Sequence, residues 1–192
     1  MASIAMHIAT ANVHLKNFED ILNKDEFIRG VVAPDVLGFL GDKIASHYGN
    51  PRFEGESLKH KFEGKVNLNK FLQERTINTD YDKGYFLHLL SDFYFFNQLL
   101  YRPKFEQNYD PHAIYNDYAV LQNDIVQKYD VHYTPETEHW NITKVGQTKM
   151  FDFKQACAFV EFCGKLDLKN MAEIIRKGGQ LPFFDRDKTQ TF

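Results

Sequence analysis

His88 and Asp92 are the two residues whose types and spacing most directly suggest chemistry. They lie four residues apart in the apolar segment 84–92, whose pattern predicts a buried helix. Their side chains should therefore share one helix face, with Cβ atoms about 5–6 Å apart. A buried histidine beside a buried carboxylate needs polar partners, because an isolated charge in an apolar interior costs several kcal/mol. A structural hydrogen bond between the two would meet that need, and so would a divalent cation, since both groups are good zinc ligands.

Three further residues add to this pair. His7 lies among apolar neighbours near the start of the chain, Asp35 follows an Ala-Pro pair, and His47 stands between a serine and a tyrosine. Taken singly, each has an ordinary explanation: a core histidine, a turn aspartate after a proline, and a histidine in a surface loop. Taken together with His88 and Asp92, they form a set of five ligand types that predicts a metal site.

The order of these residues resembles the zinc-dependent phospholipase C and P1 nuclease family, especially its short bacterial members. The resemblance covers roughly residues 4–101 and rests on a His, an Ala-Pro-Asp, a Ser-His-Tyr and a Gly-Tyr-x-x-His-x-x-x-Asp element. It implies an all-α, single-domain, multi-helix fold of the phospholipase C/P1 nuclease type. It also implies that His7, Asp35, His47 and His88 are metal ligands, and that Asp92 is a ligand shared by two metal ions.

The activity that the resemblance implies is metal-dependent phosphoester hydrolysis. One or two zinc ions would be bound, Asp35 and Asp92 would be the catalytic residues, and a two-metal centre would activate the attacking water. The expected substrate is a small-molecule or lipid phosphoester. The alternative from a different class is a non-catalytic, metal-stabilised helical protein that binds a ligand or partner.

The chain departs from the family pattern after Asp92. The secreted family members bind a third metal with a later His-x-x-x-Glu pair, and no such pair follows here. The later histidines are 112, 132 and 139, and His112 with Asp117 is the remaining candidate pair. The secreted members also use their mature amino terminus as a ligand. His14, seven residues after His7, could be an additional ligand or a core histidine, and His60 is expected to be solvated.

Helices must position these residues, and the apolar periodicity predicts several of them. A proline should end the second, because the residue before proline avoids the α conformation. The segment from 33 to 63 is expected to be ordered loop with short helical pieces, and 131–150, with Trp140 and Ile142, could be loop or a short hairpin. The predicted helices span 5–22, 25–32, 69–75, 81–101, 111–129, 152–164 and 167–177.

Composition sets the remaining expectations. The 192 residues suit one domain, which we expect to be a helical metal-binding domain over 1–182 with a loose C-terminal tail over 183–192. The net charge of −3 gives no electrostatic case for nucleic-acid binding. No stretch is apolar enough to suggest a transmembrane segment, and no signal peptide is visible, so a cytoplasmic location is expected. Cys157 and Cys163 are expected to be reduced, buried thiols.

Overall fold

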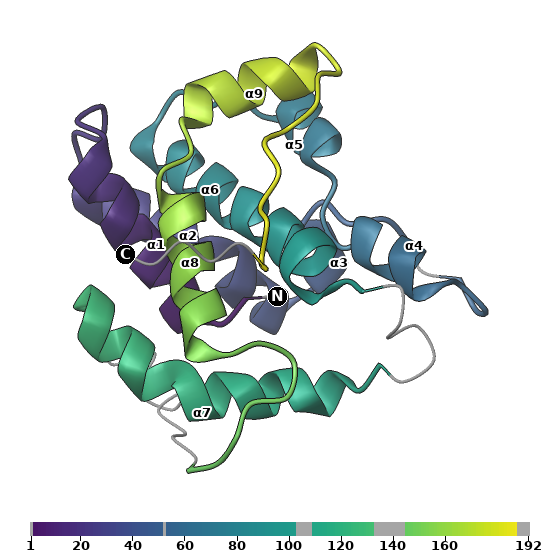
Figure 1. The fold of residues 1–192 in the computed structure, drawn as a ribbon. Coiled ribbons are helices and arrows are strands. Elements are labelled where there is room, and N and C mark those ends of the chain that lie inside the picture. Colours follow the sequence, from purple (N-terminus) through teal and green to yellow (C-terminus); the bar gives the residue numbers. More distant parts are fainter. Residues whose placement is uncertain (1, 52, 103–108, 133–144, 188–192) are drawn as a thin grey trace.

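The computed structural model describes residues 2–51, 53–102, 109–132 and 145–187, and these residues form helices and no strand (Figure 1). The all-α fold class and the single compact domain predicted from the sequence are therefore confirmed. The elements in chain order are α1 (Ile4–Asn17), α2 (Lys24–Leu40), α3 (Lys43–Ser46), α4 (Leu58–Glu63), α5 (Leu68–Glu74), α6 (Asp80–Tyr94), the π-helix η1 (Phe95–Leu100), α7 (Pro111–Tyr129), α8 (Phe153–Gly164) and α9 (Leu168–Arg176).

Helix α6 lies at the centre of the molecule, and its most extensive contact is with α2. Two glycines allow the two backbones to come close together. A Cβ atom added at Gly84 would lie 2.0 Å from the carbonyl oxygen of Phe27, and one at Gly30 would lie 2.1 Å from that of Tyr81. Any larger side chain at either position would push the two helices apart. This close crossing brings the ligand-bearing faces of α2 and α6 together.

The second helix is longer than the sequence predicted. The expected end near Pro34 is wrong, because α2 continues through Pro34 to Leu40. A proline inside a helix removes one backbone hydrogen bond and usually costs about 3 kcal/mol or more. Here the tight packing of α2 against α6 keeps the chain helical. Asp35 consequently lies within a helix and not in a loop.

Helix α1 packs against α2, α7 and α8, so the first helix of the chain contacts the last third of the sequence. It begins at the N-cap Ser3, whose side chain accepts a hydrogen bond from the Met6 N–H, and ends at Asn17, earlier than the predicted residue 22. Helix α7 begins at Pro111, as predicted. Trp140 and Ile142 of the ambiguous segment lie outside the described residues.

The segment 183–192, expected to be a loose tail, begins with residues that pack against the helices. Phe184 is buried against Phe159 and Phe162, and its backbone N–H donates to Gln98 Oε1 at 2.5 Å. Arg186 donates to the carbonyl oxygen of Leu99 at 2.6 Å. The buried ring of Phe184 and these two hydrogen bonds fix residues 184–186 to α8 and η1. Residues 188–192 lie outside the described part of the chain.

Within the described ranges, no helix is both long and apolar enough to cross a lipid bilayer. The apolar residues instead form one continuous core around α6. Phenylalanines fill much of this core, and the fully buried ones are Phe27, Phe62, Phe71, Phe86, Phe95 and Phe159.

Candidate metal centre

The five residues predicted as ligands come together at one buried position. His7 lies on α1, Asp35 on α2, His47 at the C-terminal end of α3, and His88 and Asp92 on α6. All five are buried. Four elements from three separate stretches of the sequence therefore meet at this point, which explains why each residue taken alone looked ordinary.

The turn that carries His47 is held in place from two sides. The hydroxyl of Tyr85 on α6 donates to the carbonyl oxygen of Ser46. Tyr48, which follows the histidine, has a φ of 56°, a left-handed conformation that few non-glycine residues adopt. The Arg75 side chain donates to the Tyr48 hydroxyl at 2.9 Å. These contacts stop α3 after one turn and direct the His47 ring toward α6.

The ligand atoms of the five residues lie at short distances from one another. His47 Nε2 is 3.6 Å from Asp35 Oδ1, 3.5 Å from Asp92 Oδ2 and 3.2 Å from His88 Nε2. His88 Nε2 is 3.7 Å from Asp92 Oδ2, and His7 Nε2 is 3.3 Å from Asp92 Oδ1. Two overlapping triads, His7–His88–Asp92 and Asp35–His47–His88, each offer three ligand atoms within 4.8 Å of one another and could hold a metal ion.

The Nδ1 atoms of the three histidines all point away from this centre toward hydrogen-bond partners. His88 Nδ1 lies 2.7 Å from the carbonyl oxygen of Val31, and His47 Nδ1 lies 3.0 Å from that of Lys43. Because a carbonyl oxygen only accepts, both Nδ1 atoms must carry the proton. In the neutral rings, both Nε2 atoms are then bare and face the centre. This is the second-sphere arrangement that metal-binding histidines almost always show.

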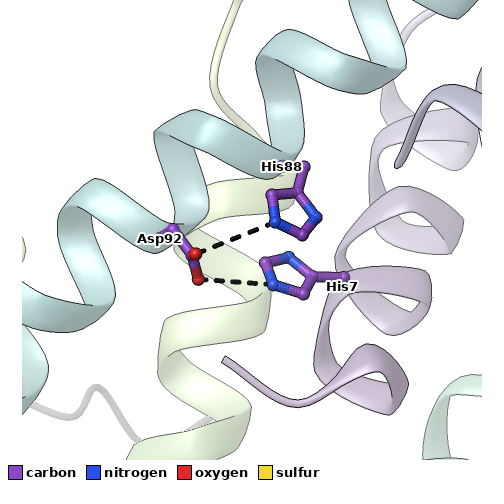
Figure 2. Close-up of side chains that lie close together, drawn as sticks. All are labelled: His7, His88 and Asp92. Atoms are coloured by element: carbon purple, nitrogen blue, oxygen red, sulfur yellow. Dashed lines mark ion pairs between the residues drawn. The ribbon is translucent and has the colours of Figure 1, made fainter. Parts of the chain in front are cut away.

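The Nδ1 atom of His7 also has a hydrogen-bond acceptor, but this acceptor is a side chain and not a backbone carbonyl. Its Nδ1 lies 2.9 Å from the Ser91 hydroxyl oxygen, and that hydroxyl donates to the carbonyl oxygen of His88 at 2.8 Å. Since the serine proton is already directed elsewhere, His7 Nδ1 must be the donor. The rings of His7 and His88 stack, with centroids 3.7 Å apart, an arrangement that disfavours a positive charge on both. His7 Nε2 is therefore directed at Asp92 (Figure 2).

Buried polar atoms normally have hydrogen-bond partners, and leaving one without a partner costs about 1–3 kcal/mol. Within the described structure, His7 Nε2, Asp35 Oδ1 and Asp92 Oδ2 have none. A single proton would satisfy one pair of these converging atoms. A divalent cation would satisfy all of them at once, so this donor set fits a metal ion.

The charges of the cluster suit metal binding. Burial lowers the pKa of His88 to about 3. Burial alone would raise the pKa of Asp35, but its contact with His47 and the other histidines bring it below its usual range. Burial likewise opposes ionisation of Asp92, but nearby positive charge and the contact with His7 hold its pKa well below normal. Ionised carboxylates and a neutral imidazole are the forms that bind metals.

The centre has two unequal halves. In a tetrahedral zinc site with ligand bonds of about 2.0–2.1 Å, neighbouring ligand atoms are about 3.3–3.5 Å apart. Four contacts span 3.2–3.7 Å and are compatible with such a site: those of His47 Nε2 with Asp35, His88 and Asp92 Oδ2, and that of His88 Nε2 with Asp92 Oδ2. On the other side, His7 Nε2 faces Asp92 Oδ1, which also accepts the Ala2 N–H at 2.8 Å.

Figure 2 shows the residue that joins the two halves. One carboxylate oxygen of Asp92 faces the imidazole of His88 and the other faces that of His7, and the two rings stack on each other. This arrangement is compatible with a carboxylate shared by two metal ions.

The other histidines considered from the sequence lie elsewhere. His14 is a core histidine: it is buried, stacks on Phe18 and Phe27, and its Nδ1 contacts the Gly164 carbonyl oxygen. Burial, its largest influence, lowers the pKa of His14. His60, His112 and His132 are exposed, and His132 contacts Asp130. His139 lies outside the described residues.

Asp117, the suggested partner of His112, is buried for a different reason. It accepts three backbone hydrogen bonds from residues 149–151. Its oxygens are therefore satisfied by the protein itself. Among the described residues, neither it nor His112 belongs to a group that could hold a metal ion.

Four supporting groups were not anticipated from the sequence: the Ser91 hydroxyl, the Val31 and Lys43 carbonyls, and the Ala2 N–H. Backbone groups carry no signal in the residue types. The residue type of Ser91 did carry a signal, because it is a polar residue directly before Asp92 in the mostly apolar segment 84–92.

Comparison of the chain with models of protein families, with curated proteins and with solved structures found no match. The geometry of the five candidate ligand residues is therefore the basis for assigning a function.

Proposed function

We propose that the chain is a metal-dependent phosphoester hydrolase of the zinc-dependent phospholipase C and P1 nuclease type. The observation that carries the proposal is the convergence of five buried side chains, of which His7 Nε2, Asp35 Oδ1 and Asp92 Oδ2 lack hydrogen-bond partners in the described structure. Their order along the chain, within an all-α fold, adds support from the resemblance.

The residues would hold up to two zinc ions in different ways. Asp35, His47, His88 and one oxygen of Asp92 would hold the first ion. His7 and the other oxygen of Asp92 would hold the second, leaving positions for water and substrate. Zinc in such a site activates water near neutral pH and offsets negative charge on a phosphoryl oxygen.

The protein's own contribution would be orientation and charge. The Nδ1 hydrogen bonds fix the planes of the three imidazoles, so the ligand atoms need little reorganisation. Asp35 Oδ1 is buried and lacks a partner in the described structure, so it is suited to hold the first ion, and the carboxylate would orient the attacking water. Asp92 would keep the two halves at a fixed separation.

The surface next to Asp35 favours a substrate with an apolar part. The residues that follow it on α2 include the exposed apolar side chains of Val36, Leu37, Phe39 and Leu40. Exposed apolar patches commonly mark binding sites. We therefore favour a lipid phosphoester over a fully water-soluble one, and nucleic acid is disfavoured by the net charge.

One observation favours the alternative, a metal-stabilised helical protein without catalysis. The first half of the centre offers four protein ligands, and structural zinc sites are saturated in this way, whereas catalytic sites keep an open position. A coordination position open to water and substrate would exist only if the His7 side of the centre also binds an ion. Occupancy of the His7 side therefore separates the two functions.

The experiment combines metal analysis with an activity screen. The full chain is purified without chelator, its metal content is measured, and it is assayed with added zinc, manganese or iron. The substrates are a soluble phosphodiester, a phosphomonoester and a short-chain phospholipid. We expect metal-dependent hydrolysis that chelation abolishes and zinc restores, with the phospholipid preferred. Bound metal without turnover on any ester would support the non-catalytic alternative, and protein that binds no metal would refute both.

A further inference from the structure

We infer that Ser91 is a positioning residue that determines which nitrogen of His7 faces the metal centre. This inference rests on the proposed function and concerns the second, more open half of the centre. Ser91 is fully buried between α6 and α1, and it touches none of the proposed metal positions directly.

The hydroxyl of Ser91 has a fixed direction. It donates to the carbonyl oxygen of His88, three residues earlier on the same helix, at 2.8 Å. Its lone pairs are then left for His7 Nδ1, 2.9 Å away. A hydroxyl that has already donated can only accept from the imidazole, so it selects the tautomer with the proton on Nδ1.

His7 depends on this side chain more than the other two histidines depend on theirs. His88 Nδ1 is held by the backbone carbonyl of Val31. His47 Nδ1 has two possible acceptors, the carbonyl of Lys43 at 3.0 Å and the hydroxyl of Ser46 at 2.9 Å. For His7 Nδ1, within the described structure, the acceptor shown is Ser91. The tautomer of His7 is thus the one that a single substitution can change.

The other tautomer would close the second half of the centre. With the proton on Nε2, His7 would donate to Asp92 Oδ1, which lies 3.3 Å away. That hydrogen bond would remove a nitrogen ligand and occupy a carboxylate oxygen in one step. The first half, which uses Asp35, His47, His88 and Asp92 Oδ2, would keep its ligands. Ser91 therefore controls the second ion selectively.

The test measures zinc affinity and imidazole tautomers separately. Zinc is titrated against a competing chelator into the full chain and into Ser91→Ala, Ser91→Thr and Ser46→Ala. Loss of an outer-sphere partner typically weakens metal binding on the order of 10–100-fold. We expect this loss in Ser91→Ala for the weaker ion only, recovery in Ser91→Thr, and a smaller change in Ser46→Ala, which retains the Lys43 carbonyl.

Nitrogen-15 NMR of the metal-free parent protein gives a readout that needs no variant. We expect the His7 proton on Nδ1, and a proton on Nε2 would overturn the inference. Equal affinity of Ser91→Ala and parent for both ions would also overturn it, as would equal weakening of both ions in a folded variant. A parent that binds a single ion refutes the role of Ser91 but leaves the four-ligand site standing. A parent that binds no zinc refutes the proposed function as well.

Discussion

Asp92 and Asp117 are both fully buried carboxylates, but the chain surrounds them in opposite ways. Asp117 on α7 accepts hydrogen bonds from three consecutive backbone N–H groups, those of residues 149–151, at 2.6–3.1 Å. Asp92 on α6 accepts one backbone N–H, from Ala2, while its Oδ2 has no hydrogen-bond partner in the described structure. The Asp117 carboxylate fixes the loop at residues 149–151, whereas Asp92 keeps an oxygen that could bind a cation.

His7 and His14, both on α1, show the same contrast between a candidate metal ligand and a core residue. Both are buried on α1. His14 is covered by the rings of Phe18 and Phe27, whereas His7 stacks on another histidine and points its Nε2 at a carboxylate. Burial of a polar residue therefore does not indicate function. What distinguishes the metal centre is that inward-facing atoms able to accept a hydrogen bond meet there without donors between them.

The largest effect on stability is expected at the satisfied carboxylate. Asp117→Ala would leave three backbone N–H groups without an acceptor, two of them buried. We expect a loss of roughly 3–5 kcal/mol, since hydrogen bonds to charged groups contribute about 1.5–3 kcal/mol each and are not additive. The melting temperature should fall by on the order of 10 °C, at about 2–4 °C per kcal/mol for this size. Bound zinc per folded chain should stay at the parent value, and its loss would show that Asp117 belongs to the metal centre.

The next effect in size is that of removing the metal from the parent protein. A ligand present at 100 times its dissociation constant stabilises the native state by about 2.7 kcal/mol. Chelation should therefore lower the melting temperature by roughly 5–10 °C. Zinc should restore it, whereas magnesium, which prefers oxygen ligands, should restore it poorly. An unchanged melting curve after verified metal removal would contradict a site that joins α1, α2, α3 and α6.

Asp92→Asn should change the stability of the metal-free protein less than the two changes above, but it should abolish metal binding. An amide is a much poorer bridge between two cations, so both ions should be lost, while His7→Gln should lose only the weaker one. Without metal, the substitution removes a charge from a cluster that lacks donors, so we expect a change within about 1 kcal/mol. If Asp92 were instead a structural partner of His88, the same variant would cost about 1–3 kcal/mol and leave metal content unaltered.

These residues also show how far the sequence can predict the structure. Helical periodicity and apolar content predicted the all-α class and the position of the central helix, because both are local properties. The predicted end of α2 was wrong, because a proline such as Pro34 usually indicates the end of a helix. The close packing permitted by Gly30 and Gly84 keeps the chain helical beyond it. The buried Phe184 was missed for a similar reason, since its partners lie on α8.

The five ligand residues could be named from their types and order, and the structure brings all five together. The two halves that we propose for the centre could not be predicted, because they depend on interatomic distances between four elements. The tautomers depend on backbone carbonyls and on the direction of one serine hydroxyl. The sequence thus predicts which residues form the centre, and the packing determines what each of their atoms faces.

The smallest expected effect is the pH dependence that His14 contributes. Burial lowers the pKa of His14 from its usual 6.5, so the native state keeps the ring neutral where the unfolded chain begins to protonate it. Stability should therefore be fully present above pH 6.5 and decline as the pH falls below it, by at most about 1.4 kcal/mol per pH unit. Urea unfolding of the metal-free parent and of His14→Gln between pH 8 and pH 5 isolates the contribution of His14 to this pH dependence. His88, whose pKa is also lowered, is present in both proteins. We expect a shallower decline in His14→Gln together with unchanged zinc binding at neutral pH. Parallel declines would show that His14 is protonated equally in both states, and lost zinc would place it in the metal centre with His7.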